Sequence, residues 1–255
     1  MDLSRVTVVL PALDEADALP AALASFPAGT DLVVVDNGSS DVTAGIAAAL
    51  GARVVCEPRR GFGAACWAGV EACPRAEVVA FADADGSFDG ADLVDLAGPV
   101  LRGEADLVIG SRALGRREPG AMSRLALLEN RVLGAACGLL FGVPLSDLGP
   151  FRALRRDVLV GLGMRDRGQG WPLEMVGRAG RAGLRVVEVP VRYRHRAGGA
   201  SKVSGSLRGS ARAAAAMAAV TWRLLTERHA PAGSRRPAEP GGGDQVAEAA
   251  EWRAR

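Results

Sequence analysis

Short apolar runs alternate with Ala- and Leu-rich stretches along the first 112 residues of the chain. The apolar runs predict strands at 6–10, 31–35, 53–56, 77–82 and 106–110. The stretches between them predict helices at 15–26, 42–50, 63–72 and 92–102. Uninterrupted apolar strands separated by helices are typical of a mostly parallel sheet that is covered on both faces. The pattern therefore predicts an α/β fold with helices on both faces of the sheet.

The pattern changes in the second half of the chain. Here it predicts helices at 123–141, 157–162 and 173–182, a turn-rich segment at 142–150 and a strand at 185–193. A polar Gly/Ser-rich loop at 198–206 then leads into an Ala-rich helix at 207–228. From residue 230 onward Pro, Gly, Glu and Arg dominate, and such a segment has too few large apolar residues to pack. We expect one domain at 1–229, followed by a disordered tail at 230–255.

Composition narrows the function without naming it. The chain has 255 residues, of which 49% are hydrophobic, and its net charge of +2 gives no general basic field for nucleic acid. The four cysteines form no Cys-x-x-Cys pair and there are two histidines, so a zinc site is disfavoured and a reduced, cytoplasmic chain is expected. The N-terminus lacks the pattern of a signal peptide. The apolar stretch 211–225 is interrupted by two arginines and falls short of the ~20 residues of a membrane span.

Two carboxylates, Asp83 and Asp85, follow the predicted strand 77–82. In parallel α/β sheets ligands bind at the carboxyl ends of the strands, and residues two apart in extended chain point to the same side. Like charges this close repel unless a cation lies between them, and oxygen ligands suit Mg²⁺ or Mn²⁺ shared with a substrate phosphate. A solvated Asp/Gly turn is the alternative, and the pair alone does not exclude it.

Polar residues also follow the first two predicted strands. Asp36 and Asn37 come after strand 31–35, and Glu15 comes shortly after strand 6–10. Each group has a structural alternative, because Asp41 can cap the next helix and acidic residues favour a helix N-terminus. The segment 192–202 holds four cations, which suit phosphate contacts but also fit a solvated basic loop.

Taken in order, these segments resemble family 2 glycosyltransferases with the GT-A fold. The nearest likeness is to the branch that contains dolichyl- and polyprenyl-phosphate mannose or glucose synthases. The resemblance rests on seven segments with compatible spacing: 10–15, 35–43, 61–65, Asp83 with Asp85, 110–112, 147–152 and 196–202. Three features depart from the family pattern: Asp14 replaces the usual Asn, Pro150 replaces a frequent Gly, and the motif of processive members is absent.

The resemblance implies a role for individual residues. The nucleotide-sugar site would include Pro11, Leu13, Glu15, Asp36, Asn37, Gly63, Asp83, Arg196, Ser201 and Lys202. The metal, Mg²⁺ or Mn²⁺, would lie at Asp83 and Asp85, and Arg112 would lie near the transferred sugar or the acceptor phosphate. Arg124, Arg131 and Arg152 would be acceptor-binding candidates. Asp147 would be the general base if the acceptor is a hydroxyl. The nucleotide-binding half would span about 1–112, the acceptor half about 113–206 and the C-terminal helix about 207–229.

The resemblance implies a metal-dependent, inverting enzyme that transfers one sugar from a GDP-mannose or UDP-glucose type of donor. The acceptor would be a lipid phosphate, such as a polyprenyl phosphate, or a small hydroxyl compound. Two alternatives stay open: a sugar-phosphate nucleotidyltransferase, and a catalytically silent nucleotide-sugar binder. Helix 207–228 would either pack on the domain or rest on the inner face of the plasma membrane.

Overall fold

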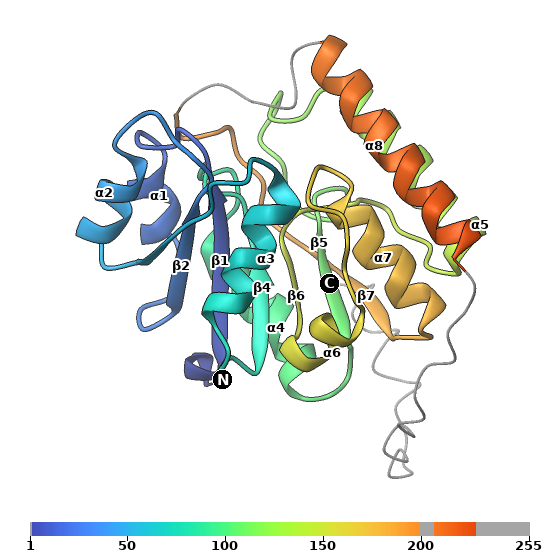
Figure 1. Cartoon of the computed structure of the whole chain (residues 1–255), viewed down its shortest axis with the longest axis horizontal. Helices are drawn as coiled ribbons and strands as arrows, with labels where there is room; N and C mark the ends of the chain where they lie inside the picture. The colour runs from blue at the N-terminus through green and yellow to red at the C-terminus, as the bar shows by residue number, and fades with distance from the viewer. Residues whose placement is uncertain (1, 199–206, 228–255) are drawn as a thin grey trace.

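A computed structural model describes residues 2–198 and 207–227 of the chain (Figure 1). Within these ranges one seven-stranded sheet has the order β3-β2-β1-β4-β6-β5-β7. The strands are β1 (Val6–Ala12), β2 (Asp31–Asp36), β3 (Arg53–Cys56), β4 (Val78–Phe81), β5 (Leu107–Ser111), β6 (Arg152–Arg155) and β7 (Val186–Pro190). Ser201, Lys202 and the tail 230–255, for which the sequence made predictions, lie outside the described residues.

The mostly parallel sheet confirms the predicted fold class, but it contains one strand that the sequence did not predict. Strand β6 pairs antiparallel with both β4 and β5. Its first residue, Arg152, pairs with Phe81, the last residue of β4. The chain therefore enters β6 at the edge where the parallel strands end, and the segment just before β6 lies at that edge.

Helices cover both faces of the sheet, as the sequence predicts (Figure 1). The helices are α1 (Leu19–Ala24), α2 (Thr43–Ala49), α3 (Phe62–Ala72), α4 (Leu93–Leu101), α5 (Arg124–Phe141), α6 (Arg156–Gly161), α7 (Trp171–Arg181) and α8 (Leu207–Thr226). Alternate side chains of β1 enter two separate cores, because successive strand residues point to opposite faces. Val9 packs in the core with α3 and α7, whereas Val8 and Leu10 pack in the core with α1 and α4.

Helix α1 is shorter than predicted. The sequence favoured a helix at 15–26, but the helix begins at Leu19 and ends at Ala24. Pro20 stands in its first turn, where a residue without an N–H is tolerated, and Asp14 has a φ of 49°, outside the helical region. The residues between β1 and α1 therefore form a loop at the end of the strand, which leaves Glu15 at that edge of the sheet.

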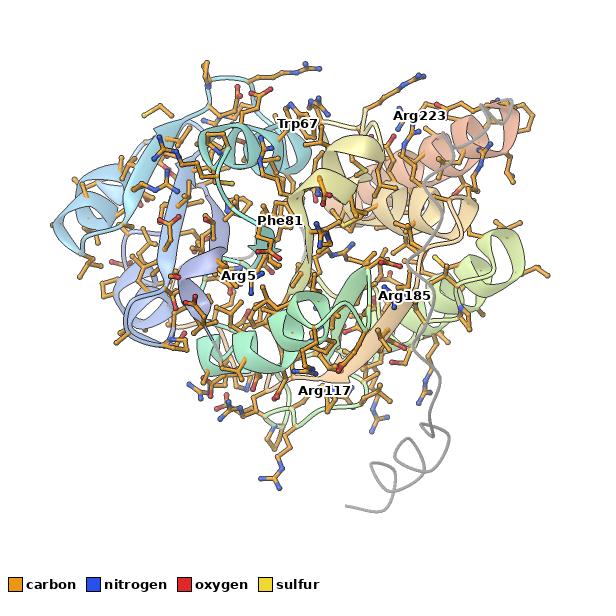
Figure 2. The ribbon with its side chains drawn as sticks, turned by 90° about the horizontal axis from the view of Figure 1, so that it is seen from below. Arg5, Trp67, Phe81, Arg117, Arg185 and Arg223 are labelled. Atoms are coloured by element: carbon orange, nitrogen blue, oxygen red, sulfur yellow. The ribbon has the colours of Figure 1, made fainter. Side chains whose placement is uncertain are left out.

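Helices α5 and α8 both pack on α7 at one side of the molecule (Figures 1 and 2). Val220 and Leu224 of α8 are buried, so the described part of this helix packs on the domain. This packing was one of the two alternatives that the sequence left open for the helix. The fully buried Glu174 of α7 links the elements: Arg178 lies 2.8 Å away and Arg223 of α8 lies 3.1 Å away. Among the described residues, no helix combines the length and hydropathy needed to cross a membrane.

Candidate active site

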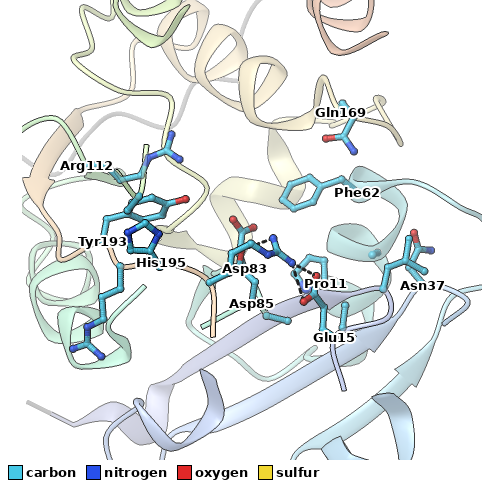
Figure 3. A pocket seen from close by; sticks show the side chains of 17 residues that line it. Pro11, Glu15, Asn37, Phe62, Asp83, Asp85, Arg112, Gln169, Tyr193 and His195 are labelled. Atoms are coloured by element: carbon cyan, nitrogen blue, oxygen red, sulfur yellow. Dashed lines mark hydrogen bonds and ion pairs between the residues drawn. The ribbon is translucent and has the colours of Figure 1, made fainter. Parts of the chain in front are cut away.

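A cleft of about 530 Å³ lies at the carboxyl ends of the parallel strands (Figure 3). It brings together residues that the sequence predicted from separate segments. Those that line it are Pro11, Leu13, Glu15, Asn37, Asp83, Asp85, Arg112 and Arg196. Their convergence follows from the topology, because parallel strands end at the same edge of a sheet.

Asp83 and Asp85 lie at the centre of the cleft, directly after β4 (Figure 3). Asp85 is buried and accepts a hydrogen bond from the backbone N–H of Ser87 at 2.9 Å. The Asp83 carboxyl has no hydrogen-bond or ion-pair partner within the described part of the chain. Burial, and then the nearby charge of Asp85, raise the pKa of Asp83 from its ordinary value to about 7.

These two carboxylates suit a divalent cation that the substrate helps to bind. A cation would offset the burial of the Asp83 charge and its repulsion by Asp85, and carboxylate oxygens are the ligands that Mg²⁺ and Mn²⁺ prefer. The described residues contain no cluster of three or more acidic, His or Cys ligands. The remaining ligands would therefore come from a bound phosphate and from water, which is the usual arrangement for Mg²⁺.

Arg196 bridges two elements of the site. Its guanidinium donates to Asp85 at 2.7 Å and to both carboxylate oxygens of Glu15 at 2.7 and 2.9 Å (Figure 3). The segment after β7 thereby reaches the ends of β1 and β4. In this arrangement Arg196 neutralises Asp85 and Glu15, whereas Asp83 faces the cleft with no cation bound to it in the part of the chain that the structure describes.

Arg112, which follows β5, is fixed by Asp147 from the loop before β6. Asp147 accepts from the backbone N–H of Arg112 at 2.9 Å, from Nε at 2.7 Å and from a terminal guanidinium nitrogen at 2.8 Å. Burial opposes the charge of Arg112, but the hydrogen bonds to Asp147 hold its pKa above the ordinary value. Asp147 is 1% exposed and both of its carboxylate oxygens are engaged. In this arrangement Asp147 positions Arg112, and its role as a general base stays a prediction that these contacts do not favour.

Glu188 of β7 supports this pair in turn. One of its carboxylate oxygens accepts from the backbone N–H of Ser146 at 2.8 Å. The other accepts from the Ser146 hydroxyl at 2.8 Å and from the backbone N–H of Asp147 at 3.1 Å. Glu188 therefore fixes the loop that carries Asp147. A single acidic residue within an apolar strand sets Glu188 apart in the sequence, but the loop that it binds could not be predicted from the sequence.

The basic segment after β7 is more strongly neutralised than its sequence suggested. Arg192 donates to Asp92 at 2.8 Å, and Arg194 pairs with Asp89. Tyr193 lies between them against the Phe88 ring, with 5.1 Å between ring centroids, and Arg112 lies over the Tyr193 ring. These contacts anchor the segment to the loop after β4. With Arg196 bound to Asp85 and Glu15, three of its four predicted phosphate-binding cations are already paired.

Asn37, predicted beside the base, binds the backbone of the loop before α3. Its amide nitrogen donates to the carbonyls of Glu57 and Arg59 at 2.9 and 2.8 Å, and its amide oxygen accepts from Gly61 at 2.8 Å. It lines the cleft while it shapes the loop before α3. Asp36, predicted to contact the base, does not line the cleft and accepts from the backbone of Ser39 at 3.0 Å.

Two further predicted residues have structural roles away from the cleft. Gly63 lies against the backbone of the 166–167 loop, where an added Cβ would stand 2.6 Å from the Asp166 carbonyl oxygen. Arg152, predicted to bind the acceptor, is 1% exposed and donates to the carbonyls of Gly149 and Pro172. Burial lowers the pKa of Arg152 to about 10. In this arrangement Gly63 permits close packing and Arg152 braces the loop before β6. Neither residue lines the main cleft, and their binding roles stay predictions.

The arginines of α5 lie outside the main cleft. Arg131 lines a smaller cleft of about 60 Å³ together with Asn130, Arg117 and Asp147. Arg124 is exposed at the first turn of α5 and lines neither cleft. Arg131 therefore shares the smaller cleft with Asp147, whereas Arg112 lines the main cleft. Arg124 contacts neither cleft in this arrangement.

Two residues that the sequence did not single out also line the main cleft. Phe62 and Gln169 lie together on the side away from Arg112 (Figure 3). Phe62 stood inside one of the quoted segments without a role. Gln169 lies in a loop far along the chain that carries no recognisable motif, so no sequence signal linked it to the site.

The mostly parallel sheet and the acidic, arginine-flanked cleft at its strand ends are those of a GT-A glycosyltransferase. The chain belongs to glycosyltransferase family 2, because the family model described as "Glycosyl transferase family 2" matches residues 7–162. This membership excludes the predicted alternative of a sugar-phosphate nucleotidyltransferase.

Individual relatives extend the comparison. An uncharacterised glycosyltransferase of Mycobacterium tuberculosis is 49% identical over 208 residues, which cover 80% of this chain and 92% of the relative. The polyprenol monophosphomannose synthase of Mycolicibacterium smegmatis is 32% identical over 225 residues, covering 79% and 82% of the two chains. Among solved structures, glucosyl-3-phosphoglycerate synthase of M. tuberculosis in complex with Mn²⁺, UDP-glucose and phosphoglyceric acid matches with a TM-score of 0.62 and 27% identity, covering 85% and 79%.

Proposed function

We propose that this chain transfers one sugar from a nucleotide-sugar donor to a phosphate-bearing acceptor, with Mg²⁺ or Mn²⁺ held by Asp83 and Asp85. The observation that carries the proposal is the Asp83 carboxyl, which has no hydrogen-bond or ion-pair partner among the described residues and lies beside Asp85 at the centre of the cleft. A cation and a diphosphate would satisfy this charge together. The similar synthase from M. tuberculosis, whose structure contains Mn²⁺ and UDP-glucose, supports the same use of the cleft.

The residues of the chain have distinct tasks in this proposal. The metal would neutralise the diphosphate as it leaves, which is the charge that builds up during sugar transfer. Arg196 would add positive charge on the same side, and Glu15, which it contacts, would lie near the donor ribose. Arg112, held rigid by Asp147, would face the transferred sugar or the acceptor phosphate. One in-line displacement at the anomeric carbon, with inversion, is the simplest reaction.

For the acceptor we propose a polyprenyl phosphate. A phosphate oxygen is already nucleophilic and needs little base catalysis, which agrees with Asp147 being engaged by Arg112 on both oxygens. The 32% identical mannose synthase, whose name specifies a polyprenol product, supports a lipid acceptor. Arg131, beside the Arg112–Asp147 pair, is our candidate for a second acceptor contact.

A lipid acceptor implies contact with a membrane surface, and the outer faces of two helices suit it. Exposed apolar side chains lie on α5 and α8: Leu125, Leu128, Val132, Leu139, Trp222 and Leu225. Apolar residues on the outside of an amphipathic helix can enter the headgroup region of a bilayer. Co-sedimentation with anionic liposomes tests this contact. We expect Leu128→Glu with Leu139→Glu to reduce pelleting, and equal pelleting of this variant and the wild type would exclude α5 as the contact.

A small phosphate-bearing hydroxy acid is the second candidate acceptor. It is favoured by the phosphoglyceric acid in the similar synthase structure. This acceptor would need a general base other than Asp147, because that carboxylate is engaged by Arg112.

Product analysis with labelled donors separates these possibilities. The protein would be incubated with Mn²⁺ and either UDP-[¹⁴C]glucose or GDP-[¹⁴C]mannose, with undecaprenyl phosphate in vesicles or with 3-phosphoglycerate. We expect label to enter the lipid phase with one donor. Label in the 3-phosphoglycerate fraction would support the second candidate. Nucleoside diphosphate binding without transfer to either acceptor would contradict both and favour a silent binder.

A further inference from the structure

The main cleft has two arms of different chemistry on either side of Asp83 and Asp85 (Figure 3). One arm is lined by cationic and aromatic groups, among them Arg112 and His195. The other arm is lined by the ring of Phe62 and the amide of Gln169, which carry no charge. A nucleotide that places its diphosphate at the central carboxylates would therefore place its uncharged base in the second arm and its sugar in the first.

Few side-chain polar groups in the uncharged arm are free to contact a base. Asn37 also carries an amide, but both of its N–H donors bind the loop at 57–61 and its oxygen accepts from the same loop. The amide of Gln169, by contrast, makes no hydrogen bond to any other described residue. Gln169 therefore offers one donor group and one acceptor group to a ligand in this arm.

The loop that carries Gln169 is held rigidly. The buried Glu174 accepts from the backbone N–H groups of Arg165 and Asp166 at 2.9 and 2.6 Å. The Asp166 side chain then accepts from the backbone of Gly168 at 2.9 Å. These bonds fix the backbone just before Gln169, so the fold sets where its side chain starts at the rim of this arm.

The same loop is joined to the first turn of α3, which carries Phe62. The backbone N–H groups of Gly63 and Ala64 donate to the carbonyls of Gly168 and Arg167 at 3.0 and 2.9 Å. Gly61, with a φ of 146°, and Gly63 flank Phe62, and any Cβ at either would collide with this loop. The two glycines thus allow α3 and the loop to approach closely, which brings Phe62 and Gln169 together.

We propose that Gln169 is a specificity-determining residue that reads the hydrogen-bonding edge of the donor base while Phe62 stacks on its face. The inference rests on the proposed use of a nucleotide-sugar donor. Uracil and guanine both present a carbonyl beside an N–H, which matches the paired donor and acceptor of a carboxamide. The Phe62 ring can stack on either base, so Gln169 is the residue that distinguishes uracil from guanine.

Replacing Gln169 by Glu tests the proposal, because a carboxylate accepts but does not donate. Affinities of UDP and GDP would be measured by calorimetry with Mn²⁺ for the wild type and for Gln169→Glu. A carboxylate repels the uracil carbonyl but can accept from the two adjacent N–H groups of guanine. We expect UDP affinity to fall about tenfold and the GDP-to-UDP affinity ratio to rise about tenfold.

Two other variants serve as references. Arg165→Gln changes a 67% exposed side chain on the same loop, and we expect it to leave both affinities within about twofold of the wild type. Phe62→Leu removes the stacking ring, and we expect it to weaken UDP and GDP alike with an unchanged ratio. Circular dichroism would confirm that each variant is folded.

The outcomes separate this inference from the proposed function. Binding of neither UDP nor GDP by the wild type would overturn the proposed function. If the wild type binds a nucleotide but Gln169→Glu keeps its UDP affinity within about twofold of the wild type, the role of Gln169 alone is overturned. The same holds if the GDP-to-UDP affinity ratio stays within about twofold.

Discussion

Replacing Asp147 by Asn removes the negative charge from an ion pair that is almost completely buried. The side chains of Arg112 and Asp147 are 13% and 1% exposed, and three hydrogen bonds of 2.7 to 2.9 Å join the two residues. Removing one partner of such a pair leaves an uncompensated buried charge, which costs ~3–5 kcal/mol. Since Asn keeps one acceptor oxygen, we expect a loss near the lower limit, ~3 kcal/mol of unfolding free energy.

Urea denaturation followed by circular dichroism measures this loss. Asp157→Asn is the matched control, because its ion pair with Arg155 is exposed, with side chains 57% and 43% accessible. An exposed pair contributes ~0–1 kcal/mol, so the control should stay close to the wild type.

The result that would refute this reasoning is an Asp147→Asn variant of wild-type stability that binds the donor normally and has lost turnover. Such a variant would restore Asp147 as a general base. We expect instead that lost activity accompanies lost stability and that Asp147→Asn weakens the interaction of Arg112 with sugar or acceptor.

Three other perturbations follow from the described contacts. Asp83→Asn should stabilise the metal-free protein, as measured by urea denaturation with a chelator present. The pKa of Asp83 is raised to about 7 in the folded state, so the wild type loses stability as the pH rises from about 4 to 7. The gain in unfolding free energy should therefore be ~2 kcal/mol larger at pH 8 than at pH 5, and a gain independent of pH would contradict this reasoning. Gly63→Ala should lower the unfolding free energy by ~1–3 kcal/mol, because the added methyl group collides with the Asp166 carbonyl. Gly45→Ala in α2, where nothing lies within reach of an added methyl group, should be neutral or stabilising. Equal melting temperatures of the two variants would exclude the close approach at Gly63. Glu188→Gln should lower turnover through the loop that carries Asp147 while donor affinity stays within about twofold, and unchanged steady-state kinetics would remove Glu188 from the support of the site.

The sheet was predictable where its strands are apolar throughout. Strands β1, β2 and β4 are buried on both faces, so their runs of Val and Leu identified them and placed the acidic residues that follow. Strand β6 has only four residues with Arg at each end, and its pairing with β4 and β5 depends on contacts distant in sequence. The sequence therefore predicted most of the sheet but not its antiparallel strand.

The residues of the site likewise include some that the sequence predicts and some that it does not. Asp83, Asp85 and Glu15 were predictable because parallel strands end at one edge, and they do line one cleft. The structural roles of Gly63 and Arg152 were not, because their partners lie in loops that the sequence could not place beside them. A motif residue that braces a loop and one that binds substrate look alike in the sequence.

Metal-dependent release of nucleoside diphosphate tests the central claim most directly. Released UDP and GDP would be measured with UDP-glucose and GDP-mannose in the presence of polyprenyl phosphate, for the wild type and for Asp83→Asn with Asp85→Asn. The account predicts release from one donor that depends on Mn²⁺ or Mg²⁺ and falls at least ~100-fold in the double variant. Equal release by the double variant, or release that persists undiminished in chelator, would contradict a metal-assisted transfer at Asp83 and Asp85.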